Sequence, residues 1–449
     1  MVSIAKALGR IKDDLPRLID RRRIATHCRQ LSHRWREGPL NPAVTVQLFL
    51  LQILNCNTAI NHLRHLTKIT FTASAFCQAR ARLPLALLER LMSTISDALI
   101  EETRDVGRWL GHRVWHIDGS TFSMPDEPEL QTRFGQPGAQ AVGCGFPLAS
   151  LMVRCDAATG LIAKAIALPF RVHEMAHIES LHEDLRPGDV LVGDRGYCSY
   201  VHLALVLRVK LDAVFRIHQR TIVSFKRGRR RAKQYSKTQR AGKPSSQWIK
   251  SLGSNDQVVR WFKPTSKPKW CDKKLLASLP DSIELRELRY RVDRLGFRSK
   301  EITLVTTLLD GDAYLKKELA KLYQQRWRIE TRLRELKITL GLDVLKCKTV
   351  AGVLKELAVF VLVYNLVRRV CLEAARRQGV EPDRISFIDA LRWLRGAPNL
   401  ETCAQLIVNP DRNGRHQLRV IKRRAKPYKL MQKPRSILME ELMGQSVGT

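Results

Sequence analysis

The sequence lacks the paired cysteines of a zinc-binding or disulfide-rich protein. None of its ten cysteines forms a C-x-x-C pair, and the closest two are Cys144 and Cys155. Most cysteines stand beside apolar residues, as buried free thiols do in proteins of a reducing compartment. We therefore exclude a disulfide framework and expect no cysteine-bound zinc.

An apolar leader and a membrane span are also missing from the sequence pattern. The N-terminal stretch 1–15 carries charge where a signal peptide needs an apolar core. The longest apolar runs, around 44–54 and 358–364, are shorter than the roughly 20 residues that cross a bilayer. We predict a cytoplasmic protein.

Acidic residues are scarce relative to basic ones. The chain of 449 residues has 43 Asp and Glu against 78 Lys and Arg, so its formal net charge is +35. A small domain needs a net charge of only about 2–8 for solubility. The excess indicates a polyanionic partner, most commonly nucleic acid, although charge alone leaves a ribosomal or membrane-surface protein open. A hydrophobic fraction of 44% is that of a folded protein, and the length allows two or three domains.

The N-terminal segment 1–110 has the pattern of a helical DNA-binding domain. Apolar residues recur at helical spacing through 44–54 and 83–100, and basic residues crowd between them. The stretch 74–82 could present a basic helix to a DNA groove, or it could be a solvated basic face.

From Val114 onward, segments rich in β-formers alternate with helical ones. The order is three strands, helix, strand, helix, strand. The expected segments are 114–118, 148–155, 161–168, 174–186, 190–194, 200–209 and 213–217. This is the order of the ribonuclease-H-like fold, an α/β architecture in which helices flank a mixed sheet.

The last helix of that fold is delayed by an insertion. Residues 219–300 are basic and turn-rich, with strand-like segments that carry Trp248, Trp261 and Trp270. A strand over 301–308 and long helices over 313–340 and 350–378 follow. We predict a catalytic core in two parts, 111–218 and 301–400, interrupted by a β-rich insertion (219–300) and followed by a basic tail (401–449).

Two aspartates end predicted strands of this core. Asp118 precedes Gly119, and Asp194 lies in the stretch Gly-Asp194-Arg-Gly-Tyr. Singly, an aspartate at a strand end is usually a turn former. In the predicted order the first and fourth strands are neighbours, so we expect both carboxylates at one edge of the sheet.

A third acid lies on the helix 313–340. With 100° per residue, Tyr323, Arg326, Glu330 and Lys337 fall within about 60° of one face. Such a stripe could be solvated, but Leu333 places it beside the buried face. We assign Glu330 to a metal ion and the other three to DNA phosphates.

Three carboxylates suit phosphodiester chemistry. Two Mg²⁺ ions about 3.5–4 Å apart can activate the attacking oxygen and stabilise the leaving one. Mg²⁺ prefers a few carboxylates together with phosphate oxygens and water. Asp118, Asp194 and Glu330 are therefore the predicted catalytic residues and metal ligands.

The stretch Tyr323-Gln-Gln-Arg-Trp-Arg-Ile-Glu330, continued to Lys337, resembles the Tyr-Arg-Glu-Lys signature of insertion-sequence-4 transposases of the Asp-Asp-Glu (DDE) class. The contexts of Asp118 and Asp194 and the stretch 76–83 are similar to that family too. The resemblance implies a DNA transposase with a ribonuclease-H-like core, dependent on Mg²⁺ or a substituting Mn²⁺. It also implies binding to terminal inverted repeats and target DNA, a synaptic homodimer, and a place on the nucleoid of a prokaryote. Hairpin-forming members hold a flipped base on a tryptophan of the insertion, for which Trp261 and Trp270 are candidates.

Two other functions remain possible from the residues. The stretch His173-Glu-Met-Ala-His177 matches the H-E-x-x-H pattern of zinc proteases. However, a third zinc ligand is missing at the expected spacing, and a protease function would not explain the net charge of +35. A transposase fold retained only for DNA binding is the second alternative. All three predicted acids are present, which favours an active enzyme.

Overall fold

The computed structural model describes residues 19–231, 245–292, 301–396, 401–410 and 430–445. Their strands form one nine-stranded sheet in the order β3-β2-β1-β4-β5-β9-β8-β7-β6. The strands are β1 (Val114–Ser123), β2 (Leu148–Asp156), β3 (Ile162–Pro169), β4 (Val190–Gly193), β5 (Asp212–Arg216), β6 (Gln247–Gly253), β7 (Asp256–Phe262), β8 (Ser282–Arg291) and β9 (Glu301–Thr306).

The first five strands have the ribonuclease-H-like arrangement predicted from the sequence. β1, β2 and β3 form an antiparallel meander, and β4 and β5 add to β1 as parallel strands. Parallel neighbours need crossover connections, which η3 (Glu174–Leu181) and α8 (Tyr200–Arg208) supply. The expected adjacency of the first and fourth strands is confirmed.

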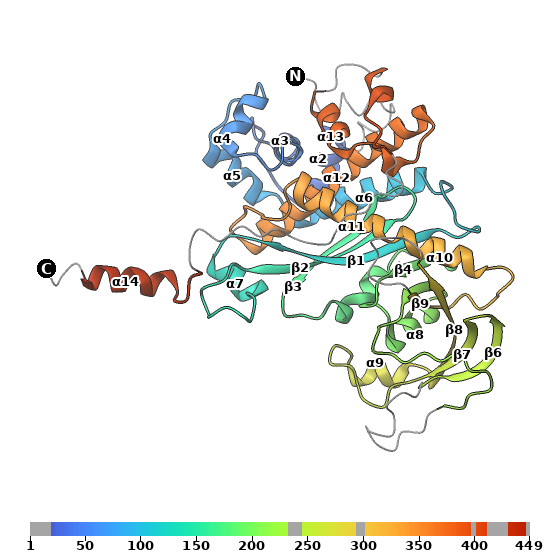
Figure 1. Cartoon of the computed structure of the whole chain (residues 1–449). Coiled ribbons are helices and arrows are strands. Elements are labelled where there is room, and N and C mark those ends of the chain that lie inside the picture. Colours follow the sequence, from blue (N-terminus) through green and yellow to red (C-terminus); the bar gives the residue numbers. More distant parts are fainter. Residues whose placement is uncertain (1–18, 232–244, 293–300, 397–400, 411–429, 446–449) are drawn as a thin grey trace.

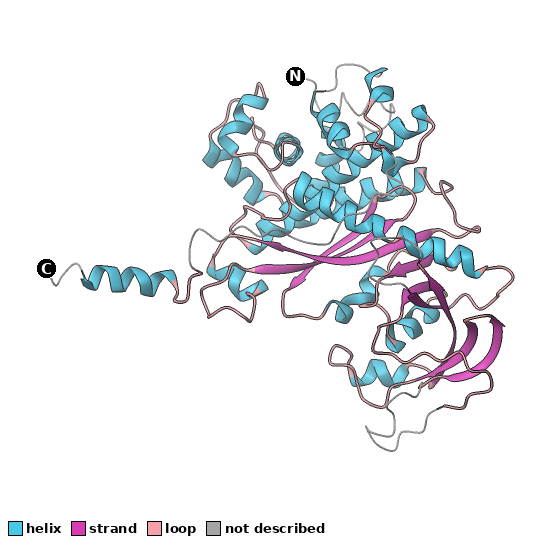
Figure 2. Cartoon of the chain, in the orientation of Figure 1, coloured by secondary structure: helices cyan, strands magenta, loops and turns pink. Residues whose placement is uncertain are grey.

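The insertion continues this sheet instead of forming a separate one. β9 pairs antiparallel with β5, and β8, β7 and β6 follow in antiparallel order. Figure 2 shows these strands as the strongly curved end of the magenta sheet. Trp248 and Trp261 lie on β6 and β7, as expected. Trp270, in contrast, lies in a turn before α9 (Lys273–Ser278), so its assignment to a strand was wrong.

Helices cover both faces of the central strands (Figure 1). One face packs against α6 (Leu85–Glu102), α11 (Trp327–Arg334) and α12 (Val350–Gln378), and the other against η3 and α8. The remaining helices of the described chain are α2 (Arg21–Gln30), α3 (Pro42–Leu54), α4 (Ile60–Leu63), η2 (Arg64–Leu66), α5 (Ala73–Arg82), α7 (Pro128–Phe134), α10 (Lys316–Gln325), η4 (Glu335–Thr339), η5 (Pro382–Arg384), α13 (Phe387–Gly396), η6 (Glu401–Gln405) and α14 (Arg435–Gln445).

The central helix α12 is the longest apolar element of the described chain. It satisfies the length and hydropathy of a membrane span, although the apolar runs of the sequence suggested that none would. However, 78% of its most apolar window is buried inside the protein. It contacts α3, α6 and α13, which makes it the core helix to which the N-terminal helices are attached.

Three predicted segments differ from the structure. β1 runs five residues past Asp118, because its pairing with β2 continues to Ser123. The segment expected as a helix over 174–186 is the 3₁₀ helix η3, kinked at His177. The helix expected over 313–340 is divided into α10, α11 and the π-helical turn η4.

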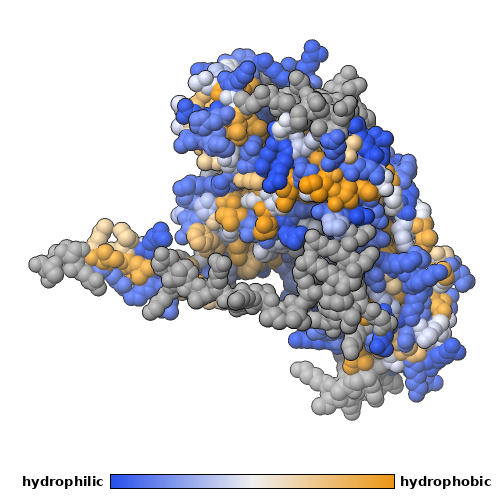
Figure 3. Space-filling model, turned by 45° about the horizontal axis from the view of Figure 1, so that its top comes forward, coloured by the Kyte–Doolittle hydropathy of each residue, from blue (hydrophilic) through white to orange (hydrophobic). Residues whose placement is uncertain are grey.

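The C-terminal helix α14 extends away from the rest of the described chain (Figure 1). Its apolar side chains, among them Leu442 and Met443, are exposed, and they form the orange surface at the left of Figure 3. Residues 411–429 and 446–449 of the predicted basic tail lie outside the described residues. The division of the chain into the five predicted segments stays a prediction.

Candidate active site

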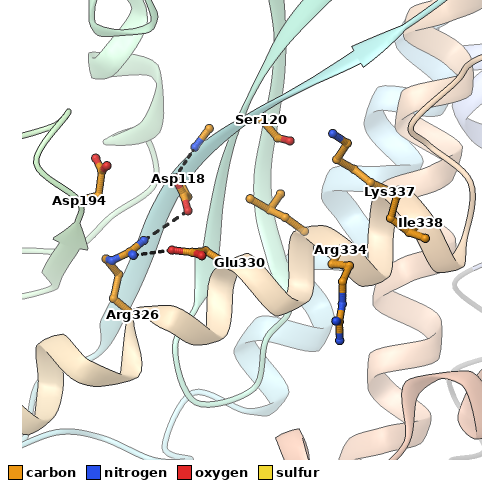
Figure 4. A pocket seen from close by; sticks show the side chains of 10 residues that line it. Asp118, Ser120, Asp194, Arg326, Glu330, Arg334, Lys337 and Ile338 are labelled. Carbon is orange, nitrogen blue, oxygen red and sulfur yellow. Dashed lines mark hydrogen bonds and ion pairs between the residues drawn. The ribbon is translucent and has the colours of Figure 1, made fainter. Parts of the chain in front are cut away.

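Asp118 lies where β1 separates from β4. β1 pairs with β4 only through Val114–His116, whereas its pairing with β2 continues past Asp118. Asp194 directly follows Gly193, the last residue of β4. The two carboxylates therefore emerge beside each other at one edge of the sheet (Figure 4).

Backbone N–H groups fix the two aspartates locally. The N–H of Gly119 donates to Oδ1 of Asp118 at 2.9 Å, and the N–H of Gly196 donates to Oδ1 of Asp194 at 2.7 Å. These charge-assisted hydrogen bonds orient each carboxylate.

Glu330 reaches the same place from α11. The buried Ile329 and Leu333 hold α11 against the core, which turns Glu330 toward the strand edge. Arg326 lies one helical turn earlier and forms ion pairs with Glu330 and Asp118. Its Nη2 is 2.6 Å from Oε1 of Glu330, and its Nη1 is 3.4 Å from Oδ2 of Asp118 (Figure 4).

The protonation of Asp118 reflects this crowding. Burial raises its pKa to about 6, and the charges of Asp194 and Glu330 act in the same direction. The N–H of Gly119 and the Arg326 guanidinium oppose that rise. The carboxylate is thus costly to keep ionised without additional positive charge.

A pocket of about 430 Å³ joins the three acids. Its lining residues are Asp118, Gly119, Ser120, Asp194, Arg326, Glu330, Leu333, Arg334, Lys337 and Ile338. Carboxylate oxygens are the donors that hard divalent cations prefer, so the donor set fits Mg²⁺. As the side chains of the described residues lie, no three His, Cys, Asp or Glu groups are close enough to hold one ion. Arg326 stands between Asp118 and Glu330, where it supplies the positive charge that a cation would bring.

The other predicted site residues are spread around this centre. Tyr323 is only 7% exposed, and its phenol lies against Arg326. Lys337, on the π turn η4, lines the far side of the pocket and pairs with Asp343 at 2.9 Å. Neither Trp261 nor Trp270 is among the residues that line it.

Two charged residues beside the acids were not predicted. Arg334 lines the pocket one helical turn after Glu330, with its guanidinium pointing away from the acids (Figure 4). The helical projection places it at the border of the same stripe, about 20° beyond Tyr323. Glu174 lines a second hollow of about 550 Å³ that shares Asp118 and Asp194. A Cβ at Gly119 would lie within 3 Å of the Glu174 carboxylate, so any larger residue there would force that side chain to move.

The structure gives the H-E-x-x-H pattern no zinc-site geometry. His173 precedes η3 as its N-cap, and His177 lies at the kink of a 3₁₀ helix, so the two histidines do not share a face of an α-helix. Both are exposed. No group of three potential ligands surrounds them in the described chain.

Comparison with known proteins agrees with the site. The family model described as Transposase DDE domain matches residues 109–366, more than half of the chain. Transposase InsG for insertion sequence element IS4, from Escherichia coli K12, is 26% identical over 375 residues, which are 79% of this chain and 77% of that protein. The putative transposase InsZ of the same organism is 24% identical over 127 residues, 28% of this chain and 42% of that protein.

Among solved structures, a cryo-EM structure of the piggyBac transposase synaptic complex with hairpin DNA has a TM-score of 0.44 and 10% identity. The match covers 90% of this chain and 82% of that one, and its score is too low to support an argument. The family match, the relative InsG and the strand order lead to one conclusion: the chain belongs to the transposase DDE domain family and is an IS4-family DDE transposase.

Proposed function

We propose that this transposase binds the terminal inverted repeats of an insertion sequence and cleaves and rejoins DNA strands there with two Mg²⁺ ions held by Asp118, Asp194 and Glu330. Enzymes of this family generally use divalent metal ions on DNA. One observation carries the assignment: acids from β1, from the residue after β4 and from α11 line a single pocket. Such an edge, open to solvent and rimmed by basic side chains, suits a DNA backbone.

The chain's own residues have separable roles in this proposal. The metal ions supply an activated nucleophile and a stabilised leaving oxygen. Asp118, Asp194 and Glu330 hold them. Arg326 pairs with Asp118 and Glu330. When a cation binds these two acids, Arg326 would release them and bind a DNA phosphate instead. Lys337 and Arg334 line the same pocket and would contact DNA farther along α11 and η4.

Cleavage of inverted-repeat DNA is expected to require Mg²⁺ or Mn²⁺ and to fail in Ca²⁺. Ca²⁺ binds the same carboxylates but accepts looser geometry and more ligands, which misaligns the reacting oxygens. The check is single-turnover cleavage of labelled end DNA in each metal, with DNA binding measured in parallel. Cleavage that persists in a chelator would contradict the metal mechanism.

Arg326→Ala and Lys337→Ala are expected to slow cleavage by about a hundredfold at saturating DNA, with little change in DNA affinity. Misplacing a reacting phosphate by about 1 Å costs on that order, whereas the remaining basic surface still holds the duplex. Lys321→Ala is the matched control, because its exposed pair with Glu318 on α10 is of little energetic value. Near-normal rates in both site variants would show that these cations only form surface ion pairs.

Of the two tryptophan candidates for a flipped base, we favour Trp270. The indole N–H of Trp261 donates to the buried Glu287 at 2.9 Å, which ties that ring to the sheet. Trp270 instead stacks on the exposed His173, with ring centroids 6.4 Å apart, and His173 lines the hollow beside Asp118 and Asp194. Both tryptophans are half-buried.

The remaining proposals concern partners and location. Residues 1–110 would recognise the end sequence, and the insertion and basic tail would add phosphate contacts that do not depend on sequence. A homodimer would hold two ends in a synaptic complex. Since its relatives are bacterial transposases and its substrate is DNA, we place the enzyme in the cytoplasm on the nucleoid.

A further inference from the structure

The N-terminal helices contain a hollow of about 580 Å³ that shares no lining residue with the catalytic pocket. It lies between the segment that joins α2 to α3 and the facing sides of α3 and α5. Its lining residues are His33, Arg34, Trp35, Arg36, Leu40, Pro42, Thr45, Ala79, Arg82 and Leu83. The volume is that of a small-molecule site.

The hollow carries positive charge that the described residues do not neutralise. Within the described residues, Arg34, Arg36 and Arg82 have no side-chain hydrogen bond or ion pair. The nearest acid along the chain, Glu37, is already engaged by Arg21 at 3.2 Å and by the Trp35 indole at 3.0 Å. Three uncompensated guanidinium groups around one hollow call for an anion.

The start of α3 adds to this preference. Leu40, Pro42 and Thr45 place the hollow at the first turn of that 13-residue helix, which has no acidic residue there. The partial positive charge of a helix N-terminus favours a phosphate.

Aromatic rings distinguish this hollow from a simple phosphate site. The rings of His33 and Trp35 stack with centroids 6.2 Å apart and an interplanar angle of 23°. Both rings are half-buried and line the hollow. Flat rings beside guanidinium groups are the combination that binds single-stranded nucleic acid, by stacking on bases and pairing with phosphates.

We propose that this hollow binds one unpaired nucleotide of the bound DNA, with its base on Trp35 and His33 and its phosphate among Arg34, Arg36 and Arg82. The inference rests on the proposed DNA-binding function and gives it a specific contact. A paired base has both faces covered by its neighbours, so a nucleotide in an overhang or a frayed end is the form that can stack. The hollow shares no lining residue with the pocket of the three acids, so this contact can be altered without changing the catalytic residues.

The direct test is photo-crosslinking in the Glu330→Gln background, in which the DNA is expected to remain uncut. One duplex carries 5-iododeoxyuridine in a short single-stranded overhang, and a second carries it at a paired position. We expect the overhang probe alone to label the peptides of residues 30–36, which contain His33 and Trp35. Labelling of other segments only, or equal labelling by both probes, would overturn the proposal.

Affinities give an independent measure. Trp35→Ala is expected to reduce the preference for overhang over blunt duplex by about tenfold, the scale of one base–aromatic stack, and Trp35→Phe to retain it. Arg29→Ala, an exposed residue of α2 outside the hollow, should leave the preference unchanged. Unchanged blunt-duplex binding in Trp35→Ala shows that the variant folds. An undiminished preference in Trp35→Ala would overturn the proposal. These affinity measurements do not depend on the assignment of the three acids.

Discussion

Asp118→Asn, Asp194→Asn and Glu330→Gln are each expected to reduce DNA cleavage by about a thousandfold or more, while DNA affinity changes by less than about threefold. Each amide keeps the shape of the side chain and removes the charge that a divalent cation needs. The three acids line one pocket, so losing any of them should affect the same ions. The DNA affinity should survive because the net charge of +35 is spread over the whole chain.

Single-turnover cleavage and Mn²⁺ titration calorimetry measure the two sides of this expectation. Glu318→Gln is the matched control, since Glu318 lies on α10 and, among the described residues, forms an ion pair only with the exposed Lys321. A variant that cuts at the normal rate would remove its residue from the site. If the wild-type protein also failed to cut the terminal inverted-repeat DNA of its own element in Mg²⁺, the alternative of a non-catalytic DNA-binding protein would be favoured.

The strand order of the core was predictable because its determinants are local. Short apolar segments with β-branched residues end at turn formers, and β2, β3, β4 and β5 lie within two residues of their predicted bounds. β1 is the exception. Its extension over Gly119–Ser123 depends on pairing with β2, whose residues are about thirty positions away, and no local signal marks it.

The face of the glutamate helix was predicted less well, for a physical reason. A projection at 100° per residue assumes one continuous α-helix. The chain instead interrupts the helix at Arg326 and widens it in η4, although Arg326, Glu330 and Lys337 still line one pocket. Tyr323 projects to the same stripe but is buried by the strands beside α10, which the projection does not include.

Glu174 could not have been placed from the sequence as a neighbour of the acids. The H-E-x-x-H pattern drew attention to it, but for a different chemistry. Its position follows from the close approach of η3 to Gly119, a contact between segments more than fifty residues apart. Such contacts depend on how the layers pack, which local periodicity does not encode.

The stability of the site depends on a charge cluster behind α11. Asp383, on η5, pairs with Arg332 at 3.0 Å and with Arg368 at 2.9 Å, and Arg328 is 3.4 Å away. The side chains of Arg332 and Arg368 are only 3% and 1% exposed. Arg332 also donates to the carbonyls of Asp156 and Ala157, so the cluster joins α11 and α12 to the end of β2.

Asp383→Ala is expected to lower the free energy of unfolding by about 3–5 kcal/mol, because it leaves two buried guanidinium groups without their counter-ion. Glu381→Ala is the matched control. That neighbouring acid is exposed and, within the described chain, forms an ion pair only with Arg328, so its loss should cost less than about 1 kcal/mol. Urea unfolding followed by circular dichroism measures both. A difference of less than about 1 kcal/mol between the two variants would contradict the structural role of Asp383.

The pH dependence gives this prediction a second readout. Burial opposes ionisation of Asp383, but Arg332, Arg368 and Arg328 more than offset it, and its pKa falls to about 2. A carboxyl whose pKa is lower in the folded state stabilises the protein above its unfolded pKa of about 3.9. That contribution to the free energy of unfolding is lost as the pH falls through about 2. In Asp383→Ala, this part of the pH dependence of stability should be absent. Arg332 lies two residues after Glu330 on α11, so losing its partner Asp383 should also disturb the position of Glu330. Under conditions in which Asp383→Ala remains folded, we therefore expect its cleavage rate to fall more than its DNA affinity.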